Sequence, residues 1–183
     1  MEKTLTITDL PTYEDNRGFL SSLWTPKVGT FVEDRYSISK QNVLRGLHGD
    51  AMTDKLIVVL HGEVEFFATP YYKNHKDFGK HTFLKLSGAE PRSVYLPRGY
   101  INGHLCISSE CVFFYKWSHY YKGAENQVSV AYDDEDLSIP WSITNPILSD
   151  RDRLCTTTFK DTIKTSWIVP KACCVGSSGQ KSL

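Results

Sequence analysis

The feature of this sequence that most constrains its fold is a series of short aromatic and β-branched runs separated by turn residues. The stretch "KLIVVLHGEVEFFATPYY" (55–72) indicates two strands joined by a turn at His61-Gly62-Glu63. Further strands are indicated by "KHTFLKL", by "SVYLP", by "NQVSVAY" and by the two halves of "HLCISSECVFFYKW", which a Ser-Ser-Glu turn joins. No segment repeats apolar residues with helical spacing over a dozen positions. The pattern therefore predicts an all-β sandwich or barrel, with a cupin or jelly-roll β-barrel and few short helices as the expected architecture.

The sequence predicts one domain followed by a tail. Its 183 residues suffice for a single ordinary core, which we expect to span residues 1–170. From Lys171 onward the chain reads "KACCVGSSGQKSL", where small and polar residues dominate. This composition predicts a flexible C-terminal tail over residues 171–183, with Cys173 and Cys174 as exposed thiols.

The charge balance narrows the classes of partner. Lys plus Arg and Asp plus Glu both number 21, so the formal net charge is zero and nucleic acid or a membrane surface is not expected as a partner. A local arginine cluster could still bind a small anion. No stretch approaches the roughly 20 apolar residues of a membrane helix, and the N-terminus does not resemble a secretory signal. Five cysteines without zinc-like spacing indicate free thiols and a cytoplasmic location.

The stretch "NVLRGLHGD" (42–50) holds the first candidates for chemistry. Arg45 and His48 are three positions apart, so they would face opposite sides of a regular strand. Gly46 can mark a bulge that changes this, as an isolated glycine in a strand often does. With a reference pKa of about 6.5, a histidine suits proton transfer near neutrality. A structural histidine held by its neighbours is the alternative interpretation.

Other polar side chains have a structural and a chemical interpretation. Lys55, at the start of a strand, either reaches solvent or faces inward, where it would stabilise an anionic ligand or a developing oxyanion. Tyr115 either packs in the core or donates a proton. In the acidic run "YDDEDLSIPW" (132–141) most carboxylates are expected in solvated turns, but one turned inward could orient a histidine.

A metal centre is not predicted. The sequence has six histidines and no His-x-His pair, although a metal pair of His48 with His104 is conceivable. The other four histidines are expected at the surface: His61, His75, His81 and His119.

Together, these segments resemble one family, the nucleotide-sugar 3,5-epimerases typified by dTDP-4-dehydrorhamnose 3,5-epimerase. The resemblance begins at "DNRGFL" and continues through "FVEDRYSISKQNVLRGLHGD", "DKLIVVLHGEVEFFATP" and "DFGKHTFLKLS". It then runs through "VYLPRGYINGHLCIS", "FFYKWSHYY", "AYDDEDLSIPW" and "PILSDRDR". The ordered series covers about Asp15 to Arg153, which is far more specific than any single motif.

The resemblance implies roles for individual residues. His48 matches the family's catalytic base, and Asp134, with Asp133 one position away, best matches the carboxylate that pairs with it. Lys55 matches the lysine beside the substrate carbonyl. Tyr115 matches the acid on the opposite face of the sugar. The family's arginines that contact diphosphate and sugar match Arg17 and Arg45.

The chain also departs from the rhamnose-type pattern at several places. Gly49 follows His48 where a tyrosine is usual, Ile101-Asn102-Gly103-His104 replaces Ala-His-Gly-Phe, and Glu33-Asp34-Arg35 replaces Gln-Asp-Asn. These departures resemble the branch that acts on GDP-linked 4-keto heptoses in capsule pathways. The resulting candidates for substrate binding are Arg17, Glu33, Arg35, Arg45, Asp50, Asn102 and His104.

The implied activity is inversion of C3, C5 or both in a nucleotide-diphosphate 4-keto sugar, with no cofactor and no metal. The resemblance also implies a homodimer. Two alternatives remain open from the residues: a metal-dependent cupin enzyme, and a non-catalytic relative that only binds nucleotide sugars.

Overall fold

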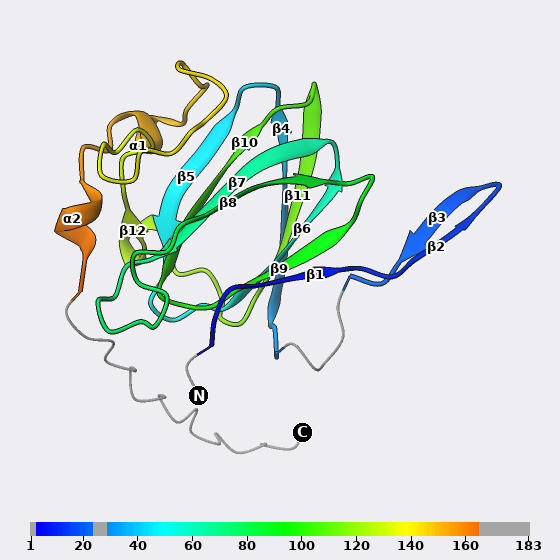
Figure 1. Cartoon of the computed structure of the whole chain (residues 1–183), viewed down its shortest axis with the longest axis horizontal. Helices are drawn as coiled ribbons and strands as arrows, with labels where there is room; N and C mark the ends of the chain where they lie inside the picture. Colours follow the sequence, from blue (N-terminus) through cyan, green and yellow to red (C-terminus); the bar gives the residue numbers. More distant parts are fainter. Residues whose placement is uncertain (1–2, 24–28, 165–183) are drawn as a thin grey trace, which may run out of the picture.

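The computed structural model describes residues 3–23 and 29–164, which form two antiparallel five-stranded sheets and one hairpin (Figure 1). The first sheet has the strand order β1 (Thr6–Asp9), β9 (Arg92–Leu96), β6 (Lys55–His61), β11 (Glu110–Trp117), β4 (Glu33–Lys40). The second has the order β12 (Val128–Ser129), β5 (Leu44–Gly49), β10 (Tyr100–Cys106), β7 (Glu63–Pro70), β8 (Thr82–Ser87). This is a jelly roll of the cupin type, so the predicted fold class is confirmed.

The strands predicted from aromatic and β-branched runs are present. The run 55–72 forms β6 and β7 around Gly62, whose φ of +73° places it in the left-handed region. The Ser-Ser-Glu turn joins β10 to β11. Helices are short, as expected: a 3₁₀ turn at Ala124–Asn126, α1 (Asp150–Arg153) and α2 (Phe159–Thr162). The predicted tail over 171–183 lies outside the described residues.

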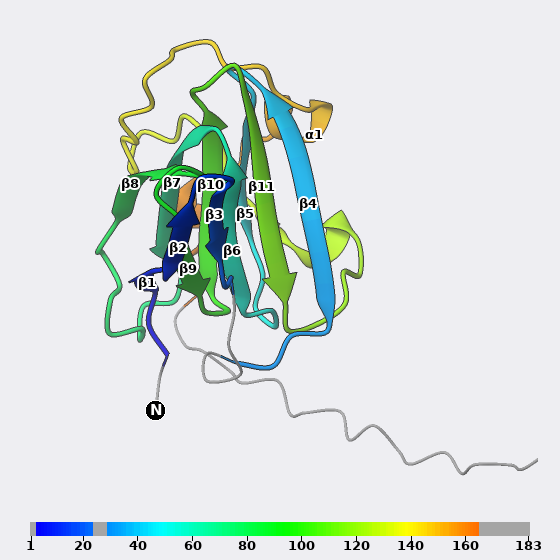
Figure 2. The same cartoon turned by 90° about the vertical axis from the view of Figure 1, so that its right-hand side faces the viewer.

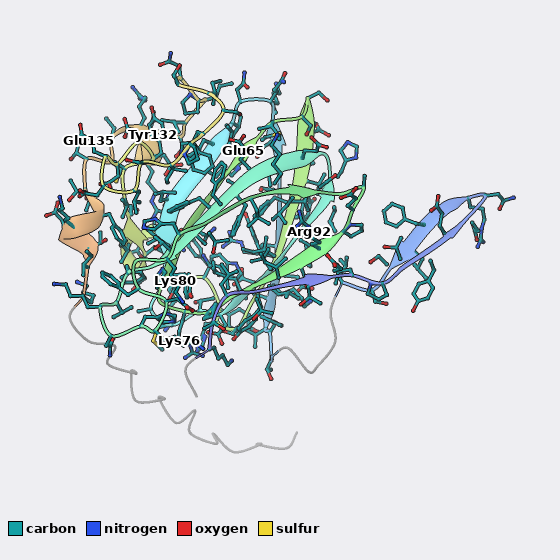
Figure 3. The ribbon with its side chains drawn as sticks, in the orientation of Figure 1. Glu65, Lys76, Lys80, Arg92, Tyr132 and Glu135 are labelled. Carbon is teal, nitrogen blue, oxygen red and sulfur yellow. The ribbon has the colours of Figure 1, made fainter. Side chains whose placement is uncertain are left out.

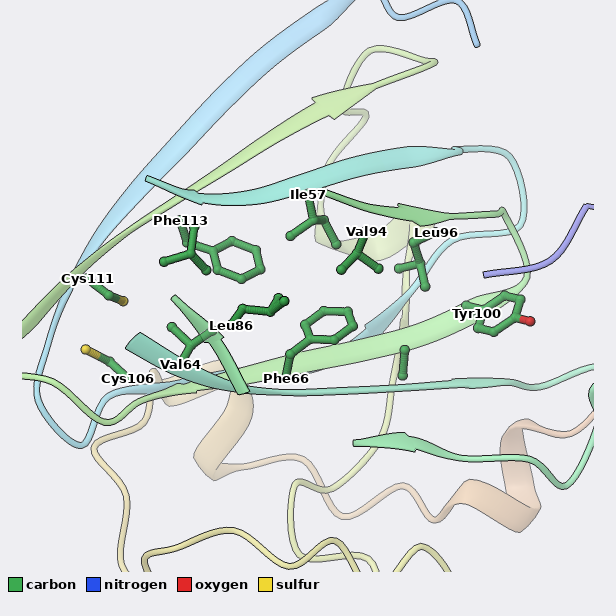
Figure 4. Packing of buried hydrophobic residues seen from close by; sticks show 12 residues of the cluster. Ile57, Val64, Phe66, Leu86, Val94, Leu96, Tyr100, Cys106, Cys111 and Phe113 are labelled. Carbon is green, nitrogen blue, oxygen red and sulfur yellow. The ribbon is translucent and has the colours of Figure 1, made fainter. Parts of the chain in front are cut away.

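The core fills the space between the two sheets (Figure 4). Side chains of the first sheet, among them Ile57, Val94 and Phe113, pack against Phe66 and Leu86 of the second. All five are less than 2% exposed. This apolar packing leaves one end of the barrel for the polar side chains described below.

The segment that follows β12, residues 130–164, covers the outer face of the second sheet and is called the covering segment below. Phe159 of α2 and Val130 belong to a second apolar cluster with Leu47 and Ile101. The main chain of Ile147 bonds to Leu44, with Leu44 N donating to Ile147 O at 3.0 Å. This covering segment therefore carries α1 to the start of β5.

The hairpin of β2 (Thr12–Asp15) and β3 (Gly18–Ser21) extends away from the body of the molecule (Figure 1), and in Figure 2 it lies in front of the sheets. It carries the exposed side chains of Tyr13, Phe19 and Leu20.

None of the helices in the described part of the chain has the length and apolar content needed to cross a lipid bilayer.

One predicted surface histidine is buried. His75 is 6% exposed, because its Nδ1 accepts a hydrogen bond from the main-chain N–H of Asp77 at 3.0 Å and its ring meets the edge of Tyr100. His61 and His81 are exposed and His119 is half-buried.

Candidate active site

A cavity of about 500 Å³ opens at one end of the barrel, between the two sheets and the α1 segment. Its polar and aromatic lining is Arg35, Arg45, His48, Lys55, Asn102, His104, Phe113, Tyr115, Trp117, Tyr121, Gln127, Ser149, Arg151 and Asp152. The cavity thus gathers residues from β4, β5, β6, β10, β11 and α1. Seven of the eleven predicted site residues line it: Arg35, Arg45, His48, Lys55, Asn102, His104 and Tyr115.

Gly46 explains how Arg45 and His48 reach the same cavity. The pairing of β5 with β10 shifts register there, because Arg45 lies opposite His104 while His48 lies opposite Asn102. One extra residue on β5 therefore turns the two side chains to one side. Gly46 has φ +139°, and a Cβ on it would lie 2.6 Å from Gly103 Cα. The predicted bulge is present, and only glycine fits it.

His48 pairs with Asp152, which the sequence analysis did not identify. His48 Nε2 lies 2.7 Å from Asp152 Oδ1. Ser149 caps α1 by accepting the Asp152 N–H at 3.2 Å, which fixes the position of the carboxylate. Burial alone would raise the pKa of Asp152, but the hydrogen bond and charge interaction with His48 outweigh it and lower the pKa. An ionised carboxylate therefore faces the imidazole.

The expected pairing of Asp134 with His48 is wrong. Asp134 is buried, but its two carboxylate oxygens accept hydrogen bonds from Leu137 N at 3.0 Å and Phe159 N at 2.8 Å. It therefore satisfies main-chain groups of the loop and of the α2 start, and neither it nor Asp133 lines the cavity. The acidic run lies at the outside of the molecule, where Figure 3 labels Glu135.

Lys55 is buried and faces the cavity. Its Nζ donates to Asn102 Oδ1 at 3.1 Å and lies 5.4 Å from the centroid of the Trp117 ring. Burial lowers the pKa of Lys55 to about 8, an effect that Asp50 opposes and Arg151 reinforces. Of the two placements that the sequence left open, the structure therefore shows the inward-facing one.

Tyr115 lines the cavity from the opposite sheet. It lies on β11 of the first sheet, whereas His48 lies on β5 of the second. Its ring is held at 5.4 Å from the ring of Phe113 and at 6.2 Å from that of Trp117. The phenol and the imidazole therefore reach one hollow from two different walls.

His104 is a buried neutral side chain. Its ring stacks parallel to Phe113, with centroids 3.7 Å apart. Burial, and then the charges of Arg45 and His48, lower the pKa of His104 to about 3. It is therefore uncharged near neutrality.

Cationic and aromatic side chains line the outer part of the cavity. The Arg35 guanidinium lies 5.1 Å from the ring of Trp117 and 4.6 Å from that of Tyr121. Glu33 is adjacent but does not line the cavity, and it accepts a hydrogen bond from Tyr121 N at 2.7 Å. Arg151, on α1, donates to Ser129 Oγ at 2.7 Å and so is held beside the cavity.

Two predicted binding residues lie elsewhere. Arg17 is at the tip of the β2–β3 hairpin, bound to Asp15, and is 85% exposed. Asp50 caps its own turn by accepting from Met52 N at 2.6 Å and Thr53 N at 3.1 Å. Within the single chain, neither residue reaches the cavity lining.

Sequence reasoning missed Asp152, Arg151, Tyr121 and Gln127. A signal was available for the first two, since "SDRD" (149–152) is a helix N-cap sequence inside a stretch already quoted for the resemblance.

Within residues 3–23 and 29–164, no three or more His, Cys, Asp or Glu side chains are grouped to hold a metal ion.

The chain is similar to known proteins in sequence and in fold. Residues 3–160 match the family model described as dTDP-4-dehydrorhamnose 3,5-epimerase. The enzyme of that name from Shigella flexneri is 32% identical over 151 residues, which are 76% of this chain and 83% of the relative. The crystal structure of dTDP-4-dehydrorhamnose 3,5-epimerase from Elizabethkingia anophelis NUHP1 superposes with a TM-score of 0.78 at 34% identity, covering 89% of this chain and 95% of that chain.

A second solved structure includes a sugar nucleotide. It is dTDP-6-deoxy-D-glucose-3,5-epimerase from Legionella pneumophila Philadelphia 1 in complex with dTDP-4-keto-L-rhamnose. It superposes with a TM-score of 0.78 at 31% identity, covering 85% of this chain and 88% of that chain.

Proposed function

The chain belongs to the dTDP-4-dehydrorhamnose 3,5-epimerase family, and from this premise we propose that it inverts C3, C5 or both in a nucleotide-linked 4-keto sugar. One observation supports the mechanism: the His48–Asp152 pair and Tyr115 line a common cavity from opposite sides, and Lys55, on the same sheet as Tyr115, reaches across to Asn102. A base on one side and an acid on the other are what inversion of a carbon requires.

His48 is the general base in this proposal. The 4-keto group acidifies the hydrogens on C3 and C5, because the carbanion left by deprotonation is an enolate. His48 Nε2 is bonded to Asp152, so Nδ1 is the nitrogen that takes the proton. Asp152 orients the ring and stabilises the imidazolium that forms. The C–H bonding pair forms the C=C bond of the enolate, and the π pair of the carbonyl moves to O4.

Lys55 and Tyr115 complete the cycle. The Lys55 ammonium, held by Asn102, offsets the negative charge that grows on O4. The Tyr115 phenol then donates a proton to the opposite face of the same carbon, the carbonyl re-forms, and the centre is inverted. The His48 imidazolium then releases its proton to solvent, and the Tyr115 phenolate takes one up. No redox cofactor or metal is required in this scheme, because the substrate's own ketone supplies the activation.

The charges of the cavity support a nucleotide diphosphate as the substrate. The cations Arg35, Arg45, Lys55 and Arg151 line it, and Asp152 is its only lining carboxylate among the described residues. Guanidinium groups bind phosphate oxygens by paired, charge-assisted hydrogen bonds. This local excess of positive charge stands out on a chain with zero formal net charge.

For the base and the sugar, we propose a GDP-linked 4-keto heptose or hexose of a capsule pathway. The departures at Gly49, Asn102 and His104 support this branch. Glu33 supports it as well, since a carboxylate can accept the two adjacent N–H donors of guanine, whereas thymine offers one such donor. Glu33 lies directly beside the stacked Arg35 and Tyr121, where a base would bind.

A homodimer in the cytoplasm is part of the proposal. The hairpin that projects from the body carries exposed Tyr13, Phe19 and Leu20, which a second copy would cover (Figure 1). In such a dimer Arg17 would serve the partner's cavity, since it does not reach its own. The free thiols of Cys106, Cys111 and Cys155 fit a reducing compartment.

The experiment that tests the function is a panel of GDP- and dTDP-linked 4-keto sugars, incubated with the enzyme in deuterium oxide and followed by NMR. Deuterium entering C3 or C5, with inversion, supports an epimerase, and the preferred nucleotide identifies the branch. Binding without any deuterium incorporation across the panel would instead indicate a non-catalytic relative.

A further inference from the structure

Two connections that cross between the sheets are joined by a set of hydrogen bonds, called the tie below. One joins β5 to β6 through residues 50–54, and the other joins β9 to β10 through residues 97–99. Gly99 N donates to Asp50 O at 2.8 Å, and Arg98 donates to Asp54 Oδ1 from its main-chain N at 3.0 Å and from Nε at 2.9 Å. The tie therefore fixes the spacing of the two sheets at the cavity end of the barrel.

The Asp54 carboxylate is the centre of this tie. It is 4% exposed, and its Oδ2 accepts from Tyr95 OH at 2.8 Å and from Lys3 Nζ at 2.9 Å. Its main chain is fixed too, since Asp54 N donates to Ser118 Oγ at 2.8 Å and Asp54 O accepts from Ser118 N at 3.0 Å. Burial alone would raise the pKa of Asp54, but the hydrogen bonds from Arg98, Lys3 and Tyr95 hold it well below its usual range.

Both ends of the tie lead directly into the active site. Asp54 is followed at once by Lys55, the first residue of β6, and Arg98 lies just before β10, which carries Asn102. The side chains of Lys55 and Asn102 meet at 3.1 Å, and Asn102 lies opposite His48 in the sheet. The Asp54–Arg98 contact thus spans the same gap between sheets as the Lys55–Asn102 contact.

We propose that Asp54 and Arg98 are a positioning pair that holds the Lys55 amine against Asn102, and so directs it at the carbonyl oxygen of the substrate. The inference rests on the proposed function. A lysine has a long flexible stem, and a buried ammonium with one hydrogen bond gains by moving toward water. The rigid start of β6 prevents that movement, because the residue before Lys55 is fixed through both its side chain and its main chain.

The test uses Asp54→Asn and Arg98→Lys. Asp54→Asn removes the charge at nearly constant size, and Arg98→Lys keeps the charge but loses the forked geometry. In the full-length enzyme with isotope-labelled lysine, NMR titration reads the pKa of the Lys55 amine, and steady-state kinetics read kcat and KM. The groups that face Lys55, namely Asp50, Arg151 and the cavity residues His48 and Tyr115, are unchanged in both variants.

In the wild type the Lys55 pKa is expected at about 8. In both variants it rises toward the unperturbed value of about 10.4 as the amine reaches water. The value of kcat falls by about 10- to 100-fold while KM changes little, since the amine acts on the developing oxyanion. Lys3→Ala is the control: it removes a half-exposed partner of Asp54 but leaves Arg98, and both readouts stay at wild-type values.

A lower melting temperature with an unchanged Lys55 pKa and unchanged kcat, in whichever variant folds, would show a purely structural tie and overturn the inference. The titration needs no substrate, so the two proposals fail separately. A Lys55 pKa that rises in the variants of an enzyme inactive on every 4-keto sugar nucleotide overturns the function alone. An active enzyme whose Lys55 does not respond overturns the positioning role alone.

Discussion

His48 Nε2 lies 2.7 Å from Asp152 Oδ1, although the two residues are 104 positions apart in the sequence. The contact forms because the covering segment docks its Ile147 main chain on the start of β5, and because Ser149 then caps α1 over Gly46 and His48. The pair leaves one imidazole nitrogen for the substrate. In the proposed mechanism, that nitrogen determines the side of the cavity from which the substrate loses a proton.

Asp152→Asn is expected to lower kcat by about 10²- to 10⁴-fold, because an amide neither stabilises the imidazolium nor holds the same tautomer. Asp134→Asn is the matched control, since it is also a buried aspartate but bonds only main-chain N–H groups. It should lower the free energy of unfolding by about 1–3 kcal/mol while the folded fraction keeps its turnover. Equal turnover losses in the two variants would contradict the assignment of Asp152.

Tyr115→Phe removes the phenol that returns the proton but leaves the base in place. We expect deuterium from solvent still to enter C3 or C5, with retention, while net inversion falls by about 10²-fold or more. NMR of the product in deuterium oxide distinguishes the two processes. Normal inversion by this variant would mean that another group is the acid.

The activity should fall as the pH rises through about 8. Burial lowers the pKa of Lys55 to that value, and the mechanism needs its protonated form, so kcat/KM is lost on the alkaline side as the ammonium deprotonates. Lys55→Arg keeps the charge to much higher pH. If this variant retains activity, its profile should lack the limb near 8; the same limb in wild type and variant would assign it to a different group.

Arg151→Ala is expected to raise KM for the nucleotide sugar by about 10-fold or more, through the loss of a charge-assisted contact to the diphosphate. Arg153→Ala is its control on the same helix. Arg153 is exposed and paired with Asp150, and it does not line the cavity. Steady-state kinetics of both variants should show the change in Arg151→Ala alone.

Local patterns in the sequence were sufficient to predict the fold and one wall of the site. The strands from β6 to β11 follow from β-branched runs and the turns between them, since these choices depend on neighbours in the chain. The grouping of Arg45 with His48 could also be anticipated, because Gly46 is the residue a bulge requires. The local pattern left open whether Lys55 faces solvent or the interior, and the structure shows that it is buried.

Pairings over long sequence distances could not be read in the same way. Asp134 and Asp152 are both carboxylates in polar loops, and only the path of the covering segment decides which one reaches His48. The place of Arg17 depends on the direction of an exposed hairpin, which no residue pattern specifies. Nor does any local signal distinguish the buried His75 from a surface histidine, because its burial comes from Tyr100 across the fold.

The proposed mechanism requires His48 to take a proton from the carbon beside the ketone. The most direct measurement is the rate at which solvent deuterium enters C3 and C5 of a 4-keto nucleotide sugar in deuterium oxide, with wild-type enzyme and with His48→Ala. The assignment of His48 as the base predicts incorporation by the wild type and a rate about 10²- to 10⁴-fold lower for the folded variant. Incorporation by His48→Ala at the wild-type rate would contradict it.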